Sequence, residues 1–126
     1  MKTKVLIIED NEQNLYLLTF LLQAHSYEVV SARDGRSGIE LAEQIQPMLI
    51  LLDIQLPGMD GYAVAKALRR SPSLADTPIV AVTSYAMAGD RERVLAAGCT
   101  GYIEKPINPD TFISEVEQHL TERPSN

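Results

Sequence analysis

The sequence predicts an open α/β fold, in which helices cover both faces of a parallel β-sheet. Short apolar runs stop on polar residues, as Leu49–Leu52 does at Asp53, and such runs are typical of strands buried on both faces. They alternate with segments whose apolar residues recur at helical spacing, such as Leu15, Leu18 and Leu22. This alternation, which no repeat or linker interrupts, indicates parallel strands joined by right-handed helical crossovers.

Five strands are expected in this sheet. They are Val5–Ile8, Glu28–Ala32, Leu49–Leu52, Ile79–Val82 and Gly101–Glu104. The second is the most polar and is expected near an edge, and Asp34 and Gly35 after it are a turn signal. The simplest order for such a doubly wound sheet is 2-1-3-4-5, as in flavodoxin-like folds. This order makes the first and third strands neighbours.

Five helices are expected between and after the strands. They cover about 11–24, a segment ending at or before 46, about 60–70, about 88–97 and about 108–120. Their ends carry residues of known preference: Asn11, Asp60 and Asn108 as N-caps, Pro109 in a first turn, Pro47 after the second helix and Gly98 after the fourth.

Composition bounds the possible functions. The 126 residues suit one domain, and 11 basic against 17 acidic residues give a net charge of −6, which is unfavourable for binding nucleic acid. The single cysteine, Cys99, excludes an internal disulfide and a cysteine-based metal site. No apolar segment is long enough for a signal peptide core or a membrane span. We therefore expect a cytoplasmic protein that binds neither nucleic acid nor membrane.

Acidic residues follow two strands that should be neighbours. Glu9 and Asp10 come after the first strand and Asp53 after the third, so three carboxylates should meet in the crevice at this edge of the sheet. Left alone they would repel one another and raise at least one pKa. A hard divalent cation resolves this conflict, because Mg²⁺ prefers oxygen ligands. The fourth and fifth strands lead to Thr83 and Lys105, which suit phosphoryl oxygens. The set predicts Mg²⁺-dependent phosphoryl transfer onto an aspartate.

The sequence resembles the receiver domains of two-component response regulators, which have CheY-like folds. The matching segments lie along the whole chain: Val5–Asn11, Leu51–Gly61, Pro78–Thr83 and Gly101–Pro106. The stretch Ala86–Arg93 looks like the fourth helix of stand-alone DivK-type regulators and of receivers attached to hybrid kinases.

The resemblance implies a role for each residue at the strand ends. Asp53 would be the phosphoacceptor, and Mg²⁺ would be bound by Asp10, Asp53 and the backbone carbonyl of Gln55. Glu9 would bind the metal directly or through water. Many relatives carry Asp at this position, so the longer side chain leaves the way in which Glu9 reaches the metal open.

The resemblance also implies roles for residues in or just after the fourth and fifth strands. Thr83 and Lys105 would bind the phosphoryl oxygens, and Thr83 and Tyr102 would form the switch. Lys105–Pro106 would be a cis peptide bond. The output face would then be the fourth helix, fifth strand and fifth helix.

The resemblance implies a single-domain response regulator. Residues 1–122 would form the receiver domain, 123–126 a disordered tail, and no output domain is expected. The phosphoryl group would come from a sensor histidine kinase or a histidine phosphotransfer protein, and a downstream protein would bind the output face. The chain would be a monomer or weak dimer. It would not be an enzyme beyond its own phosphorylation and dephosphorylation.

Three other functions are compatible with such a fold. A flavodoxin-type electron carrier needs a hydroxyl- and glycine-rich phosphate loop, whereas Glu9–Glu12 would repel FMN phosphate. A haloacid-dehalogenase-type phosphatase needs a second Asp where Gln55 stands. A receiver fold that binds partners without phosphorylation remains the alternative. We also expect Gln55 and Tyr85, each two residues past a site residue, to overhang the phosphoryl group and slow its hydrolysis.

Overall fold

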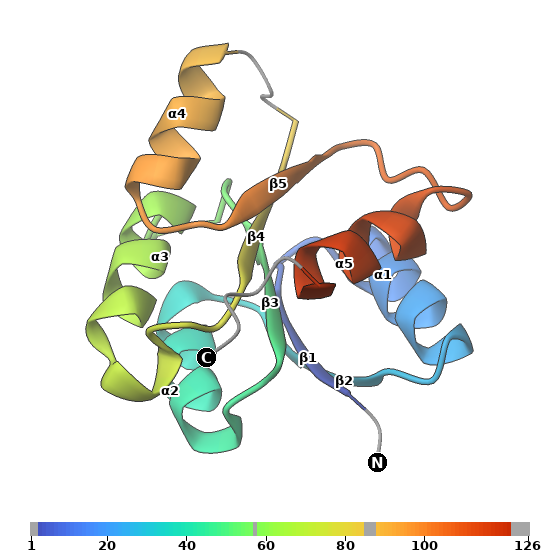
Figure 1. Cartoon of the computed structure of the whole chain (residues 1–126), viewed down its shortest axis with the longest axis horizontal. Helices are drawn as coiled ribbons and strands as arrows, with labels where there is room; N and C mark the ends of the chain where they lie inside the picture. Colours follow the sequence, from blue (N-terminus) through green and yellow to red (C-terminus); the bar gives the residue numbers. More distant parts are fainter. Residues whose placement is uncertain (1–2, 57, 85–87, 122–126) are drawn as a thin grey trace.

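The computed structural model describes residues 3–56, 58–84 and 88–121, and its centre is a five-stranded parallel sheet in the order β2-β1-β3-β4-β5 (Figure 1). The strands are β1 (Lys4–Ile8), β2 (Glu28–Ala32), β3 (Leu49–Asp53), β4 (Ile79–Thr83) and β5 (Gly101–Glu104). The predicted order is confirmed, as is the position of the polar strand β2 at an edge. The tail expected at 123–126 lies outside the described residues.

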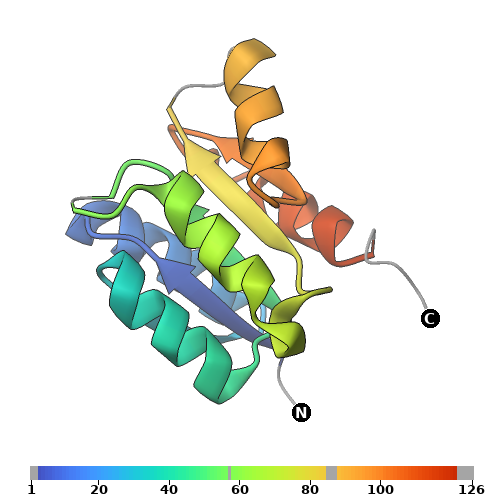
Figure 2. The ribbon, with the colours of Figure 1, turned by 90° about the vertical axis from the view of Figure 1, so that its left-hand side faces the viewer.

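Helices cover both faces of the sheet. On one side lie α1 (Glu12–Ala24) and α5 (Phe112–Thr121), and on the other lie α2 (Gly35–Ile45), α3 (Gly61–Arg70) and α4 (Ala88–Ala96) (Figure 1). A short 3₁₀ turn, Pro72–Leu74, follows α3. Figure 2 shows α2 and α3 lying side by side against the sheet. Among the described residues, no helix has the length and apolar character needed to cross a membrane.

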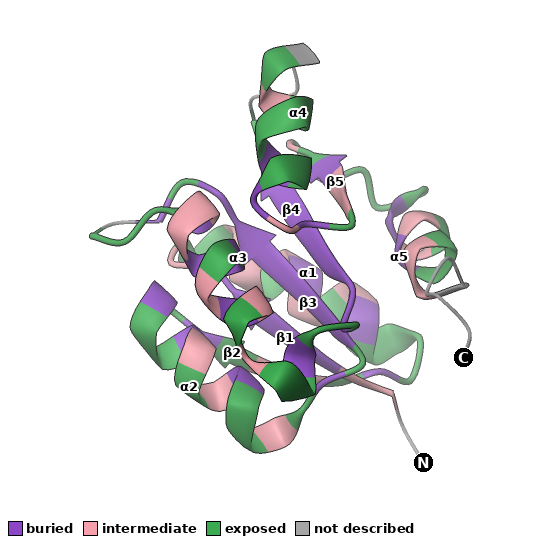
Figure 3. Ribbon diagram, turned by 60° about the vertical axis from the view of Figure 1, so that its left-hand side comes forward, coloured by how far each residue is buried: buried purple, intermediate pink, exposed green. Residues whose placement is uncertain are grey.

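The sheet divides the core into two halves. Successive side chains of a strand point to opposite faces, so in β1 Leu6 and Ile8 pack toward α2 and α3, while Val5 and Ile7 pack toward α1 and α5. Every residue of β3 and β4 is buried, and Figure 3 shows these strands enclosed between helices with exposed outer faces. A central strand is thus anchored on both faces up to its last residue.

Side chains cap several helices at their N-termini. Asn11 accepts a hydrogen bond from Asn14 N at 2.9 Å, and Asp60 accepts one from Ala63 N at 2.9 Å, as the sequence predicts. Asp34 also caps α2, accepting from Ser37 N at 2.8 Å. The sequence interpretation of Asp34 as part of a turn missed this second role. Each cap satisfies a backbone donor that has no partner within its helix.

Two helix ends agree with the predictions made from their turn residues. Helix α2 ends before Gln46, whose φ of 48° is in the left-handed region. Helix α4 ends at Ala96, and Gly98 follows with a φ of 110°. A glycine adopts this conformation without a Cβ clash, which is why it commonly follows a helix.

The expected start of the last helix is wrong. Asn108 and Pro109 were predicted as cap and first-turn residues, whereas α5 begins at Phe112. The Asn108 side chain instead accepts a hydrogen bond from Asp110 N at 3.0 Å, and its carbonyl accepts from Phe112 N at 3.0 Å. Asparagine side chains that bond the backbone two residues on stabilise a turn, so a separate turn precedes the helix.

Candidate functional site

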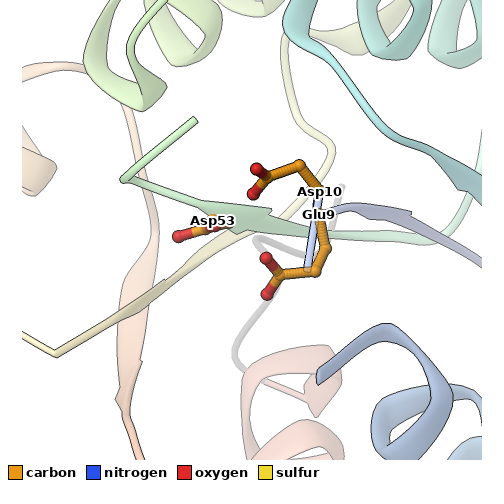
Figure 4. A group of neighbouring side chains, drawn as sticks. All are labelled: Glu9, Asp10 and Asp53. Carbon is orange, nitrogen blue, oxygen red and sulfur yellow. The ribbon is translucent and has the colours of Figure 1, made fainter. Parts of the chain in front are cut away.

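The candidate site lies where β1 and β3 end side by side. Ile8 is level with Leu52 in the sheet, so the residues that follow them meet at one edge. Glu9 and Asp10 leave β1 on different sides and turn their carboxylates toward Asp53 (Figure 4). One oxygen from each of the three carboxylates lies within 4.8 Å of the others. The convergence expected from the sequence is therefore present.

Two of these carboxylates are almost completely removed from solvent. Glu9 is 1% exposed and Asp53 is 3% exposed, while Asp10 is half-buried. Glu9 Oε2 accepts a hydrogen bond from Asn11 N at 3.3 Å. Its other oxygen, Oε1, is buried and accepts no hydrogen bond from the described residues. A buried acceptor left in this state is unfavourable unless a cation or water satisfies it.

The crowding of acids changes the protonation of Glu9. Its pKa is raised from 4.5 to about 7, chiefly because burial disfavours the charged carboxylate and secondly because Asp53 lies beside it. Lys105 and the N–H of Asn11 act in the opposite direction. The carboxylate cluster thus lacks some of the positive charge that would balance it.

Lys105 provides the positive charge of the described site. Its Nζ donates a hydrogen bond to Asp53 Oδ1 at 3.1 Å and lies 3.6 Å from Glu9 Oε1. The same Asp53 oxygen accepts a second bond, from Gln55 N at 3.0 Å. The backbone N–H of Lys105 donates to the carbonyl of Thr83 at 2.8 Å, which joins the chain after β5 to the end of β4.

The remaining predicted residues lie at or near this edge of the sheet. Thr83 is the last residue of β4 and is buried, and the Gln55 side chain is exposed. Tyr102 is half-buried in β5 and packs against the core half covered by α2, α3 and α4. The Lys105–Pro106 bond is cis, as expected. Tyr85 lies outside the described residues.

A closed loop supports Asp53 from the other side. Gly61 N donates to the Ile54 carbonyl at 3.0 Å, which joins the start of α3 to the residue after Asp53. A Cβ at Gly61 would lie 2.4 Å from Ile54 Cα, which is too close for two carbon atoms that are not bonded to each other. Only glycine therefore allows this close approach, and the contact fixes the backbone on which Asp53 stands.

One residue beside the site, Arg33, is not indicated by any pattern in the sequence. The guanidinium of Arg33, which follows β2, donates to the Asp10 carbonyl at 3.1 Å and to Glu12 Oε1 at 3.2 Å. No motif marks this residue, because the contact joins segments 21 and 23 positions apart in the chain. The adjacency of β1 and β2 in the sheet was the one signal that could have indicated it.

The donor set fits a hard divalent cation. The site opens into a cleft of about 710 Å³ lined by Glu9, Asp10, Asn11, Glu12, Gln13, Asn14, Asp53, Gln55 and Lys105. Three carboxylates lie close together and form an all-oxygen set, and one buried oxygen of Glu9 accepts no hydrogen bond from the described residues. Magnesium prefers such ligands and retains waters, which an open cleft admits.

Comparisons with known proteins cover most of the chain. Residues 5–117 match the family model of the response regulator receiver domain. The polar-differentiation response regulator DivK of Brucella anthropi is 42% identical over 120 residues, which are 95% of this chain and 98% of that protein.

Solved structures agree in fold. The chemotaxis protein CheY4 of Vibrio cholerae matches with a TM-score of 0.90 and 30% identity, covering 94% of this chain and 98% of that one. The receiver domain of the sensor histidine kinase PA1611 from Pseudomonas aeruginosa matches with a TM-score of 0.89 and 30% identity, covering 97% and 100%. That structure has a magnesium ion coordinated in its active site cleft.

Proposed function

Because this chain belongs to the response regulator receiver domain family, we propose that it is a single-domain response regulator of two-component signalling and that Asp53 is its phosphoacceptor. The donor is a sensor histidine kinase or a histidine phosphotransfer protein. The proposed receiver domain is residues 1–122, an organisation supported by the match to almost the full length of DivK. The proposed location is the cytoplasm, where such donors present their phosphoryl groups.

The observation that carries this proposal is the contact between Asp53 and Lys105 inside the acidic cluster. A buried carboxylate held by a lysine at 3.1 Å, with Glu9 and Asp10 beside it, is positioned to act as a nucleophile whose surroundings stabilise added negative charge. A structural ion pair would not require two further acids at the same point.

In the proposed reaction an Asp53 oxygen forms a bond to phosphorus while the bond from phosphorus to the donor atom breaks. The electron pair of that bond stays with the leaving group, which is the imidazole nitrogen of a phosphohistidine or the carboxylate of acetyl phosphate. Lys105 and the Thr83 hydroxyl then bind phosphoryl oxygens. Catalysis of this kind consists mainly of positioning and charge neutralisation.

The residues that would hold Mg²⁺ are Asp10, Asp53 and the carbonyl of Gln55, with Glu9 acting directly or through water. The chemistry that Mg²⁺ supplies when bound is neutralisation of charge on the phosphoryl oxygens. The three converging carboxylates support this assignment, as does the buried Glu9 oxygen that accepts no hydrogen bond from the described residues. The family relative with magnesium in its cleft supports it as well.

The proposed output face consists of α4, β5 and α5. Thr83 and Tyr102 lie on β4 and β5, so a phosphoryl group that attracts the Thr83 hydroxyl would change the space next to this face. Phosphorylation adds about −1.5 to −2 charge at pH 7, which is enough to bias a two-state surface. A downstream protein would bind one of the two states, and the chain itself would be a monomer or weak dimer.

Acetyl phosphate with MgCl₂, followed by intact-mass measurement, tests the acceptor. We expect one added phosphoryl group on the wild type and none on Asp53→Asn. Asp60→Asn is the matched control, because it removes an acid from the same loop and keeps a good helix cap. Uptake by Asp53→Asn at the wild-type rate would show that the acceptor is misassigned. No uptake by the wild type would favour a receiver fold that binds partners without phosphorylation.

A further inference from the structure

Arg33 connects the edge strand of the sheet to the loop that carries the acidic cluster. It follows β2 directly and precedes Asp34, the cap of α2. Its guanidinium donates to the Asp10 carbonyl at 3.1 Å and to Glu12 Oε1 at 3.2 Å. These contacts lie on either side of Asn11, at the turn between β1 and α1.

The backbone at this turn decides where the Asp10 carboxylate points. Within the described part of the chain, this carboxylate accepts no hydrogen bond, so no side-chain partner fixes it. Its neighbour Glu9 is held differently, because its N–H donates to Ala32 O at 3.0 Å and its carboxylate accepts from Asn11 N. Asp10 is thus the one acid of the cluster whose carboxylate accepts no hydrogen bond from the described residues. The Arg33 contact with the Asp10 carbonyl restrains its backbone instead.

We propose that Arg33 is a positioning residue for the metal site, which holds the turn so that Asp10 presents its carboxylate to a bound cation. This inference rests on the proposed function, in which the cluster holds Mg²⁺. A guanidinium suits the task because its donors form a rigid planar fork that binds two acceptors together. Outer partners of this kind commonly tune metal affinity without touching the metal.

The charge of Arg33 acts in the opposite direction from its geometry. A positive group beside the cleft repels Mg²⁺, so a residue acting through charge alone would bind the metal more tightly once neutralised. The Arg33 side chain is 55% exposed, which weakens this repulsion by solvent screening. If Arg33 acts by positioning Asp10, replacing Arg33 weakens Mg²⁺ binding. If Arg33 acts only through its charge, removing that charge tightens Mg²⁺ binding.

Calorimetric titration of the full chain with MgCl₂, at constant pH and ionic strength, separates the two effects. The variants are Arg33→Lys, which keeps the charge but loses the fork, and Arg33→Gln, which loses both. Arg36→Gln is the control, because it removes an exposed arginine three residues away in α2. Circular dichroism of each variant shows whether the fold is kept.

We expect the Mg²⁺ dissociation constant to rise about threefold or more in both Arg33 variants, less than the tenfold or larger effects of buried outer partners. The control should bind as tightly as the wild type or slightly more tightly. Unchanged binding by Arg33→Lys together with tighter binding by Arg33→Gln would overturn the inference and leave the proposed metal site intact. No binding of Mg²⁺ by the wild type would overturn both.

Discussion

The guanidinium of Arg91 on α4 donates through Nε, at 3.1 Å, and through a second nitrogen to the hydroxyl of Tyr102 on β5. It also lies 5.1 Å from the centre of the tyrosine ring. These contacts join a helix and a strand of the proposed output face. They also involve the residue proposed as its switch, so Arg91 stabilises this half-buried orientation of Tyr102.

The first prediction concerns this contact between Arg91 and Tyr102. Arg91→Ala should raise the affinity for the phosphate analogue beryllofluoride about two- to fivefold. The proposed switch moves Tyr102, and removing an exposed charged contact lowers the cost of that movement by roughly 0.5 to 1 kcal/mol. Amide shifts titrated with beryllofluoride and MgCl₂ measure this affinity. In the wild type the shifts should include α4, β5 and α5.

The control is Arg93→Ala on the same helix. Arg93 lies over the ring of Tyr62 at 4.2 Å, and Tyr62 belongs to α3 rather than to β5. This variant should bind the analogue as the wild type does. Equal effects of the two substitutions, or analogue shifts confined to α1 and α2, would count against the proposed switch.

The second prediction concerns pH. Because the pKa of Glu9 is raised from 4.5 to about 7, the folded, metal-free protein binds more protons than the unfolded chain between these values. The contribution of Glu9 to stability should therefore fall as pH rises from about 4.5 to 7. Urea unfolding in EDTA at several pH values measures this, and Glu9→Gln should remove the contribution.

Magnesium supplies the complementary measurement. Cations favour the charged carboxylate, so MgCl₂ should stabilise the wild type more at pH 8 than at pH 5.5. The Glu9→Gln protein should show a smaller difference. A wild-type profile that matches Glu9→Gln across the whole range would refute the role given to the buried acid.

The third prediction concerns a structural arginine far from the site. The guanidinium of half-buried Arg69 donates to the carbonyls of Gly98, Leu74 and Thr77 at 2.8, 2.8 and 2.6 Å. Arg69→Ala should lower the free energy of unfolding by about 2–3 kcal/mol, because it removes charged donors from several partly buried carbonyls.

Arg70→Ala provides the comparison for Arg69. Arg70 is exposed and is the last residue of the same helix, so its loss should change stability by no more than about 0.5 kcal/mol. Urea denaturation of both variants gives the two values. Equal losses would mean that the carbonyl contacts of Arg69 contribute little.

The fourth prediction concerns the lifetime of the phosphorylated form. In the proposed phosphorylated form, water would approach phosphorus opposite the Asp53 oxygen. Gln55, which is exposed beside the site, is a neutral amide that cannot act as a base. Tyr85, outside the described residues, has a phenol with a reference pKa of about 10. We therefore expect both side chains to shield the group rather than to activate water.

Single-turnover dephosphorylation of Tyr85→Ala and Tyr85→Phe tests the shielding. The alanine variant should lose its phosphoryl group faster than the wild type, whereas phenylalanine, which keeps the ring, should behave as the wild type does. An alanine variant that is no faster, or slower, would show that Tyr85 leaves the water path open.

The fold could be predicted because short apolar runs indicate buried strands and apolar residues at helical spacing indicate helices. Both patterns lie within short segments of the sequence. The convergence of Glu9, Asp10 and Asp53 followed from the same pattern, since adjacent parallel strands end at one edge. Other features depend on where long side chains reach, which spacing does not determine. The contacts of Arg33 with the Asp10 loop and of Arg91 with Tyr102 are of this kind.

Short polar side chains limited the prediction in another way. Asn108 can cap a helix or stabilise a turn with the same oxygen, and the sequence around it suits both. The structure has the turn, and α5 begins four residues later, at Phe112. Asp34 shows the converse, because a residue interpreted as a turn signal caps a helix.

The close approach of Gly61 to Ile54 has a consequence for which substitutions this loop can accept. The backbone next to Asp53 is fixed by that approach, whereas the Met59 side chain is exposed. A different side chain at Met59 should therefore leave the backbone beneath Asp53 in place. A methyl group at Gly61 should displace it, so two positions only two residues apart differ sharply in the substitutions they tolerate.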